Sequence, residues 1–90
     1  MSYTVIWLNS AERELARLWL DAAARDEISA AAFEIDRLLR DDPEGQGESR
    51  SKTGRILFVH PLAILCEVVK DDRKVFVQHI WRFGRRSQRD

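Results

Sequence analysis

Two clusters of basic residues flank apolar runs in the second half of the chain, and their spacing indicates binding of a polyanion. One cluster leads into the run 55–59 and includes Arg55, whereas the other leaves the run 75–81 and includes Arg82. If these runs are neighbouring or nearly neighbouring strands, the cations flank one groove and hold phosphates in a salt-dependent way. The outer members of the clusters, which are candidate nucleic-acid-binding residues, are Arg50, Lys52, Arg85 and Arg86.

Two aromatic residues and one histidine accompany these cations. Trp81 and Phe83 alternate with arginines and offer rings on which a base could stack. The alternative is that both rings complete the core and the arginines only solubilise the end of the chain. His79 alternates with Val75 and Val77, which indicates a partly buried histidine on an apolar strand face. At a sheet edge, the same imidazole could instead transfer a proton.

Other chemistries lack the residues that they need. Two histidines and one cysteine, without two ligands at helical or turn spacing, do not indicate a metal site. Gly45 and Gly47 are not followed by the Lys-Ser/Thr pair of a phosphate-binding loop. Cys66 lies inside an apolar run and is expected to be a buried hydrophobe, not a reactive thiol. We therefore expect neither a metal nor another cofactor.

The formal net charge of zero conceals a charge asymmetry between the two halves. Residues 1–48 hold five Lys/Arg and eleven Asp/Glu, a net charge of −6. Residues 49–90 hold ten Lys/Arg and four Asp/Glu, a net charge of +6. Asymmetry of this kind indicates an anionic partner for the basic half, although it is also compatible with a merely solvated surface.

Apolar spacing predicts one strand followed by two helices. Residues 3–8 are rich in β-branched and aromatic side chains, which is typical of a strand. Asn9 or Ser10 then offers an N-cap for a helix whose apolar stripe includes Trp19. A second helix with a longer apolar stripe begins near residue 26 and ends before Pro43. The two helices are expected to form a hairpin that covers another surface with its apolar side.

The remaining residues predict a loop and three strands. Residues 43–54 are rich in glycine and serine and lack an apolar anchor, so a mobile surface loop is expected there. The runs 55–59, 62–69 and 75–81 have the composition of strands. The expected fold is therefore α+β in the order β-α-α-β-β-β, a small antiparallel sheet with the helical hairpin packed on one face.

Length and hydropathy predict one small domain in a reducing compartment. Ninety residues are expected to form a single domain, residues 1–90. No segment approaches the roughly 18 apolar residues of a membrane span, and the N-terminus lacks the basic region and cleavage site of a signal peptide. A single cysteine suits a reducing compartment. We therefore expect a cytoplasmic protein without a membrane partner.

The element order and several short motifs together resemble the RelE/ParE superfamily of toxins from type II toxin–antitoxin modules, often called plasmid stabilisation proteins. The resemblance covers residues 3–83 and depends on the whole pattern. Its motifs are Val5-Ile-Trp7, the loop Gly47-Glu-Ser-Arg50, the strand Arg55-Ile-Leu-Phe-Val59, Pro61-Leu-Ala-Ile-Leu65 and Val75-Phe-Val77.

The resemblance implies a twisted antiparallel sheet bearing the helical hairpin, and a cognate antitoxin protein that wraps the toxin and masks its groove. RelE-like members cut messenger RNA in the ribosome without a metal, and ParE-like members poison DNA gyrase. By resemblance, this chain is expected to inhibit growth, with either the ribosome and its mRNA or DNA gyrase as the target.

The resemblance also nominates catalytic residues for a metal-independent mRNA endoribonuclease. Arg55 and Arg82 match basic positions of RNA-cleaving members, and His79 is the candidate proton-transfer residue. Those members usually begin the second of the three strands with an arginine, where this chain has Ala63, and they carry a Tyr or His near the C-terminus, which residues 83–90 lack. The alternative is a catalytically degenerate protein of this fold that acts only as an interaction module.

Overall fold

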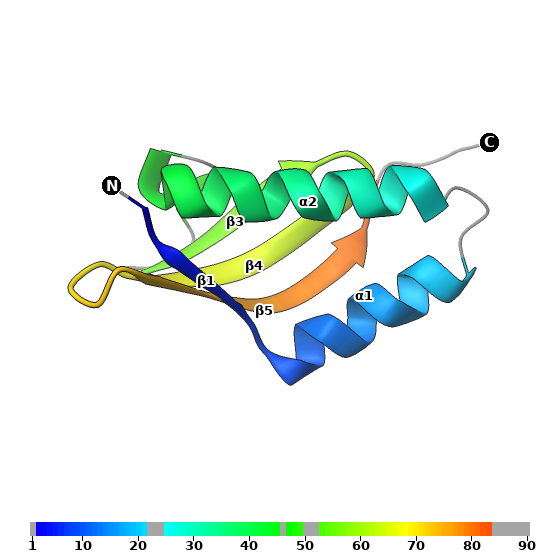
Figure 1. Ribbon diagram of the computed structural model, residues 1–90, viewed down its shortest axis with the longest axis horizontal. Helices are drawn as coiled ribbons and strands as arrows, with labels where there is room; N and C mark the ends of the chain where they lie inside the picture. Colours follow the sequence, from blue (N-terminus) through cyan, green and yellow to red (C-terminus); the bar gives the residue numbers. More distant parts are fainter. Residues whose placement is uncertain (1, 22–24, 46, 50–52, 84–90) are drawn as a thin grey trace.

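Two helices and a five-stranded sheet make up the fold (Figure 1). A computed structural model describes residues 2–21, 25–45, 47–49 and 53–83. Within these ranges, no helix is long and apolar enough to cross a membrane. The elements, in chain order, are β1 (Thr4–Trp7), α1 (Asn9–Asp21), α2 (Arg25–Asp41), the 3-10 helix η1 (Pro43–Gly45), β2 (Glu48–Ser49), β3 (Gly54–Val59), β4 (Leu62–Val69) and β5 (Lys74–Arg82).

The strands form one sheet in the order β1-β5-β4-β3-β2. Strands β3, β4 and β5 make the expected antiparallel meander, and β2 pairs antiparallel with β3. Strand β1 runs parallel to β5, so the sheet is mixed and not wholly antiparallel. Parallel neighbours need a long connection, which the two helices and three strands between β1 and β5 supply. The α+β class and the packing of helix on sheet are as expected.

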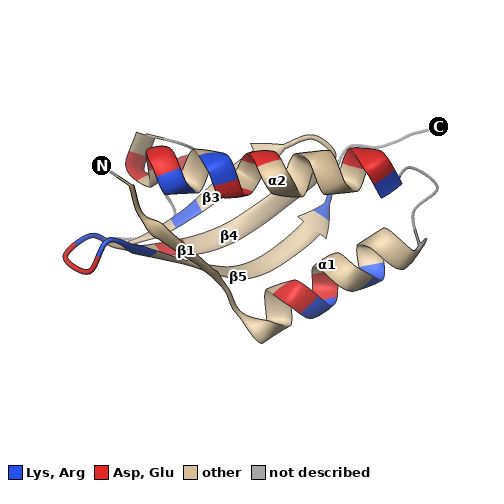
Figure 2. Cartoon of the chain, in the orientation of Figure 1, with Lys and Arg blue, Asp and Glu red and all other residues tan. Residues whose placement is uncertain are grey.

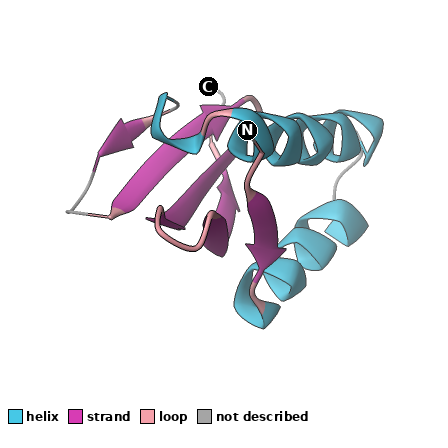
Figure 3. Ribbon diagram, turned by 60° about the vertical axis from the view of Figure 1, so that its left-hand side comes forward, coloured by secondary structure: helices cyan, strands magenta, loops and turns pink. Residues whose placement is uncertain are grey.

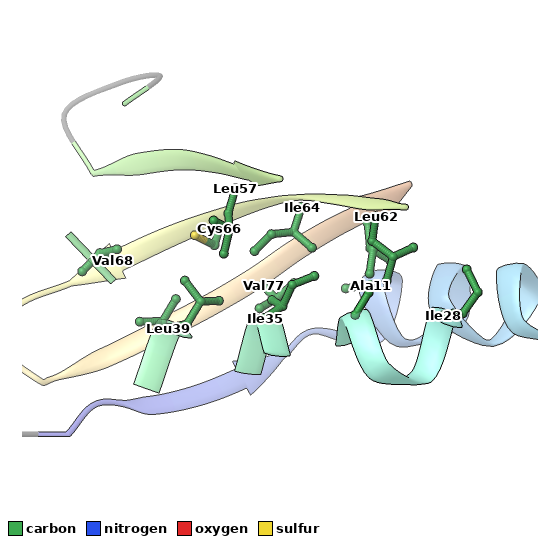
Figure 4. Close-up of a cluster of buried hydrophobic side chains, with 13 residues drawn as sticks. Ala11, Ile28, Ile35, Leu39, Leu57, Leu62, Ile64, Cys66, Val68 and Val77 are labelled. Carbon is green, nitrogen blue, oxygen red and sulfur yellow. The ribbon is translucent and has the colours of Figure 1, made fainter. Parts of the chain in front are cut away.

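Helix α2 packs its apolar stripe on one face of the sheet (Figure 3). Ile28, Ala31, Ile35 and Leu39 recur every three or four residues, so they lie on one side of the helix, and all four are buried. Figure 4 shows Ile35 and Leu39 among side chains from the strands. The sheet side of this core consists of Leu57, Leu62, Ile64, Cys66, Val68, Val75, Val77 and Ile80.

An extra residue in β5 changes which of its side chains face α2. Val77 pairs with one residue of β4 and His79 with the residue before it, so Gln78 is left over and forms a β-bulge. In a regular strand, His79 would share the apolar face of Val77. The bulge turns His79 to the opposite face and puts Ile80 in the core. The expectation that His79 lies on the apolar face of β5 is therefore wrong.

Helix α1 covers the edge of β5 beyond the point where β1 ends (Figure 1). The hydroxyl of Ser10 donates a hydrogen bond to the carbonyl of Gln78 (2.7 Å), and the carboxylate of Glu14 accepts one from the backbone N–H of Ile80 (3.1 Å). Two helix side chains thus satisfy backbone groups that an uncovered sheet edge would leave unpaired. Ser10 lies inside the helix and serves this edge, so it is not the N-cap that its position suggested.

Part of the segment predicted to be a mobile loop has regular structure. Pro43–Gly45 form the 3-10 turn, and Glu48–Ser49 pair with the start of β3. Gly47 has a φ of 66°, and a Cβ atom there would lie 2.1 Å from the carbonyl oxygen of Ile56. Glycine alone among the residue types accepts both this backbone conformation and this close approach.

The hydrogen bond at the β5 edge gives a stability prediction. Replacing Glu14 by Ala leaves the partly buried N–H of Ile80 without its acceptor, so the free energy of unfolding should fall by about 1–2 kcal/mol. Glu14→Gln keeps an acceptor oxygen and should lose less. Urea unfolding measures both values, with the exposed neighbour Arg13→Ala as the control, expected to change stability by less than about 0.5 kcal/mol. Equal losses for Glu14→Ala and Arg13→Ala would contradict this account of the edge.

Candidate functional site

The three candidate catalytic residues occupy separate positions on the sheet. Arg55, near the start of β3, pairs with Cys66. Arg82, at the end of β5, pairs with Leu62. Both partners belong to the core, so these two arginines are at positions facing α2. His79 lies on the opposite face of the sheet, which we call the outer face.

The strand register also separates the two arginines along the sheet. Their partners are four positions apart on β4, and two strand spacings lie between β3 and β5. With a rise of about 3.4 Å per residue and a strand spacing of about 4.8 Å, the Cα atoms of Arg55 and Arg82 are roughly 17 Å apart. The guanidinium of Arg55 is hydrogen-bonded to the carbonyl of Gly47, and His79 lies on the opposite face of the sheet. The three side chains therefore do not converge on one phosphate in this structure.

Of the two basic clusters, Arg55 and Arg82 fall within the described residues. The guanidinium of Arg55 donates a hydrogen bond to the carbonyl of Gly47 (3.2 Å), the residue before β2, which pairs with β3. Arg82 is exposed at the end of β5. The candidate nucleic-acid-binding residues Arg50, Lys52, Arg85 and Arg86 lie outside the described residues.

A carboxylate from α1 meets the imidazole of His79. Nδ1 of His79 lies 3.4 Å from Oε1 of Glu14, the same oxygen that accepts the N–H of Ile80. About half of the His79 side chain is exposed (54%). A carboxylate held in this way orients the ring and leaves Nε2 as the nitrogen nearer to a ligand. Sequence reasoning missed Glu14 because its proximity to β5 depends on the tertiary placement of α1.

Four ring-bearing residues gather on the outer face near the end of β5. The ring of Phe83 meets Phe58 edge-on, with centroids 5.2 Å apart, and His60 at 5.7 Å. Ala63 pairs with both Phe58 and Trp81, so two large side chains flank one small one. Ala63 is fully buried, whereas Phe58 and Trp81 are 46% and 38% exposed. The larger side chains therefore cover the alanine, and we call Phe58, His60, Trp81 and Phe83 the aromatic platform.

The burial of Trp81 and Phe83 tests the interpretation that these rings complete the core. Neither ring belongs to the core beneath α2. The backbone N–H of Phe83 donates to the carbonyl of Pro61 (2.9 Å), which ties the end of β5 to the turn between β3 and β4. The core interpretation is therefore wrong for Trp81, whose ring is a surface feature.

A second apolar surface lies between α1 and α2. It is a groove of about 720 Å³. Its apolar lining includes Trp7, Leu15, Trp19, Leu20, Ile28 and Phe33. Trp19 and Phe33 are 39% and 74% exposed, so Trp19 of the expected apolar stripe is only partly covered. Phe33 falls outside the apolar stripe of its helix, and this was the sequence signal for a second apolar surface.

Polar contacts fix Trp19 at one end of this groove. Its indole N–H donates to the hydroxyl of Ser29 (3.0 Å), and the guanidinium of Arg25 lies 4.7 Å from the centre of its ring. Arg25 also donates to the carbonyls of Trp19 and Leu20 at 3.2 and 3.4 Å. These carbonyls end α1, where backbone acceptors lack partners inside the helix. Arg25 therefore joins the two helices and holds the tryptophan in position.

Both helices carry acidic and basic residues (Figure 2). Carboxylates of Glu12 and Asp36 border the groove, and that of Asp36 is paired with Arg40 of the same helix. Both helices belong to the half with a net charge of −6. The outer face is not free of carboxylates, because the pairings of Glu48 with Ile56 and of Glu67 with Phe76 place both on it. Charge therefore suits the groove to a cationic partner and assigns no partner to the platform.

The described residues offer neither a metal cluster nor a reactive thiol. No group of three His, Cys, Asp or Glu side chains among them could hold a metal ion. Cys66 is fully buried, as expected of a small hydrophobe. Burial raises the pKa of its thiol to about 11, which keeps the thiol protonated at neutral pH, and the nearby charge of Arg55 offsets only part of this effect.

Solved structures of toxins resemble the whole fold. The RelBE2 toxin–antitoxin complex of Mycobacterium tuberculosis contains a chain with a TM-score of 0.75 and 20% identity, over 92% of this chain and all of that one. A chain of the chromosomal ParDE system of P. aeruginosa has a TM-score of 0.68 and 15% identity, over 92% of this chain and 98% of that one. The isolated E. coli RelE toxin has a TM-score of 0.65 and 14% identity, over 94% of this chain and 88% of that one.

The comparisons establish the fold and confirm the resemblance at that level. The chain has the fold of the RelE and ParE toxins, in agreement with the element order expected from its sequence. The sequence itself matches no family model and no curated protein.

The raised pKa of Cys66 predicts a pH dependence of stability. The unfolded thiol loses its proton near pH 9.0, whereas the folded thiol keeps it to about pH 11. The unfolded state therefore binds fewer protons than the folded state between these two pH values. The contribution of the Cys66 thiol to the free energy of unfolding is complete below about pH 9. It is lost as pH rises toward 11, and the loss is on the order of 1–2 kcal/mol.

Urea unfolding in reducing buffer at about pH 7 and about pH 10.5 measures this loss. Cys66→Ala should be less stable than the wild type at the lower pH, because it leaves a small cavity, but its stability should decline less between the two pH values. Equal declines in the two proteins would show that the thiol does not contribute.

Proposed function

We propose that this chain, which has the RelE/ParE fold, is the toxin component of a type II toxin–antitoxin pair and that a cognate antitoxin protein neutralises it. The observation that carries the proposal is a likeness to toxin chains that extends over nearly the full length of this chain and of its neighbours. Several of those chains were solved together with their antitoxins, which supports a protein partner for this one.

The groove between α1 and α2 is the proposed seat of the antitoxin. It combines exposed aromatic rings with the carboxylates of Glu12 and Asp36. An amphipathic helix fits this chemistry, because its apolar residues would fill the groove and flanking Lys or Arg would meet the two carboxylates. Trp19 and Phe33 would provide most of the binding energy, since large aromatic side chains dominate such interfaces.

The positions of the candidate catalytic residues support an action by binding. Metal-independent cleavage of RNA needs an acid and a base within hydrogen-bond reach of one phosphate. The Cα atoms of Arg55 and Arg82 are roughly 17 Å apart, and His79 lies on the other face of the sheet. Both targets that the resemblance implies, translation and DNA gyrase, fit an action by binding.

The same separation favours one alternative. A protein that has kept the fold but lost a convergent catalytic set can act purely as an interaction module, with the groove as its binding surface. This alternative predicts a stable complex with a partner protein and no effect on growth.

Induced expression without the antitoxin tests the proposal. Growth should stop, and co-expression of the protein encoded beside this chain should restore it. His79→Ala should still arrest growth, and mapping of RNA 5′ ends should show no new cuts. New cuts inside translated regions that vanish in His79→Ala would instead establish an endoribonuclease. Normal growth with soluble, folded protein would favour the interaction module.

Calorimetry with the purified neighbouring protein tests the groove. Phe33→Ala and Trp19→Ala should each weaken the complex by about tenfold or more. Asp36→Lys should weaken it as well and make its loss with salt shallower, because salt then screens a repulsion in place of an attraction. The matched control is Leu8→Ala, because Leu8 is about as exposed as Trp19 but does not line the groove. Equal effects of Trp19→Ala and Leu8→Ala would remove the groove from the interface.

A further inference from the structure

We infer that Arg25 determines what can bind at the hairpin end of the groove, the end at which Trp19 meets Ser29. Arg25 positions Trp19 and keeps cationic side chains of a partner away from the indole ring. The inference rests on the proposed function and deepens it, because it states which partner residues the groove accepts at each of its ends.

Arg25 makes two kinds of contact with the end of α1. Its guanidinium lies over the ring of Trp19, 4.7 Å from the ring centre, which is within the range of a cation–π interaction. The same group donates hydrogen bonds to the carbonyls of Trp19 and Leu20, at 3.2 and 3.4 Å. Helix α1 has no basic residue in its own last turn, so Arg25 supplies the cation that the negative end of a helix favours.

These contacts leave Trp19 with apolar surface to offer. Its indole N–H is its one side-chain donor, and the hydroxyl of Ser29 accepts it at 3.0 Å. One face of the ring lies beneath the guanidinium of Arg25, and 39% of the residue remains exposed. A partner residue that covers this exposed part finds neither a free donor nor an acceptor on the side chain, so an apolar side chain fits best.

The positive charge of Arg25 disfavours a second cation at the ring. Arg25 is exposed, and its hydrogen bonds with α1 end on carbonyl oxygens, which carry no net charge. Asp26 and Glu27 follow it in the first turn of α2, but neither forms an ion pair with it. A Lys or Arg of the partner at the exposed part of the ring would be repelled by a unit charge only one ring away.

A cation of the partner belongs at the opposite end of the groove. Glu12 and Trp19 both line the groove from α1, seven residues or roughly 10 Å apart along the helix. Glu12 is exposed and makes no ion pair within the described part of the chain, whereas Asp36 is already paired with Arg40. An antitoxin helix along the groove should therefore carry an apolar residue over Trp19 and a Lys or Arg about two turns away, near Glu12.

Fluorescence quenching tests the role of Arg25 without any partner. In a Trp7→Phe/Trp81→Phe protein, Trp19 is the only tryptophan, and quenching by iodide and by caesium at constant ionic strength reports the charge beside its ring. Arg25→Met keeps a long side chain but removes the charge. The quenching constant of iodide should therefore fall and that of caesium should rise, each by about twofold. Arg25→Lys keeps the charge and should stay close to the parent protein.

Neutral acrylamide measures exposure alone and so separates the charge of Arg25 from a purely structural role. If Arg25 only capped α1, Arg25→Met would raise quenching by iodide, caesium and acrylamide alike, and this result would overturn the inference. The matched control places Arg25→Met in a Trp7→Phe/Trp19→Phe protein, where Trp81 on the outer face should report no change. Circular dichroism checks that each variant keeps its helices.

Calorimetry with the purified neighbouring protein tests the specificity. Arg25→Met should weaken the complex by about fivefold or more, because Trp19 loses its fixed orientation, and Arg25→Lys should weaken it less. Lysine is then placed at each apolar position of the neighbouring protein in turn. At one position the loss of affinity should be at least about threefold smaller with Arg25→Met than with the parent, because the repelling charge is gone. The absence of any such position would overturn the exclusion of cations.

The proposed function and the role of Arg25 can fail separately. If the neighbouring protein does not bind, the proposed pairing fails, whereas opposite shifts of iodide and caesium quenching still establish the charge of Arg25 at the ring. If the complex is tight but neither quenching constant changes in Arg25→Met, the proposed function stands and the role of Arg25 is overturned.

Discussion

The β-bulge at Gln78 determines what the two faces of the sheet present. Before the bulge, Val75 and Val77 point into the core; after it, Ile80 takes that direction and His79 turns outward. A strand alternates strictly, so one extra residue exchanges the faces of every residue that follows. The core gains an isoleucine where a half-exposed imidazole would otherwise face α2. The outer face gains His79 and Trp81, and both apolar packing and surface chemistry therefore depend on this single insertion.

The same strand also explains where α1 lies. Strand β1 pairs only with the first part of β5, and the bulge begins where this pairing stops. The backbone groups of β5 beyond this point need hydrogen-bond partners, and the side chains of Ser10 and Glu14 in α1 provide them. A helix that follows the sheet edge cannot also lie flat against α2, and a groove between the two helices remains. At one end of the groove, the contacts of Arg25 and Ser29 with Trp19 join the two helices. The groove is therefore held in place by contacts within the helical hairpin.

Much of this fold could be predicted from the sequence, because local signals and topology agree. The stripe from Ile28 to Leu39, the helix end before Pro43 and the three-strand meander follow from periodicity and turn chemistry. The faces of β5 could not be predicted, since a bulge is set by how strands pair and strict alternation misassigned His79. The parallel pairing of β1 and the contact of Glu14 with His79 likewise depend on tertiary placement. Arg55 and Arg82 looked like two sides of one groove in the sequence, but the register separates them along the sheet.

The two apolar surfaces bear on how the proposed antitoxin would act. The groove lies on the helix side and borders acidic residues, whereas the platform lies on the outer face beside His79. A helix seated in the groove would not by itself cover the platform. Among the described residues, Ser10 and Glu14 of α1 contact β5 directly, and Glu14 also meets His79. An antitoxin that binds the groove must therefore either continue around the edge of β5 to the outer face or act through α1. Coupling through α1 requires that the helix favour different positions with and without the antitoxin. The hydrogen bonds of Ser10 and Glu14 oppose such a shift, so the first route, with an extended antitoxin segment, is the one that this structure favours.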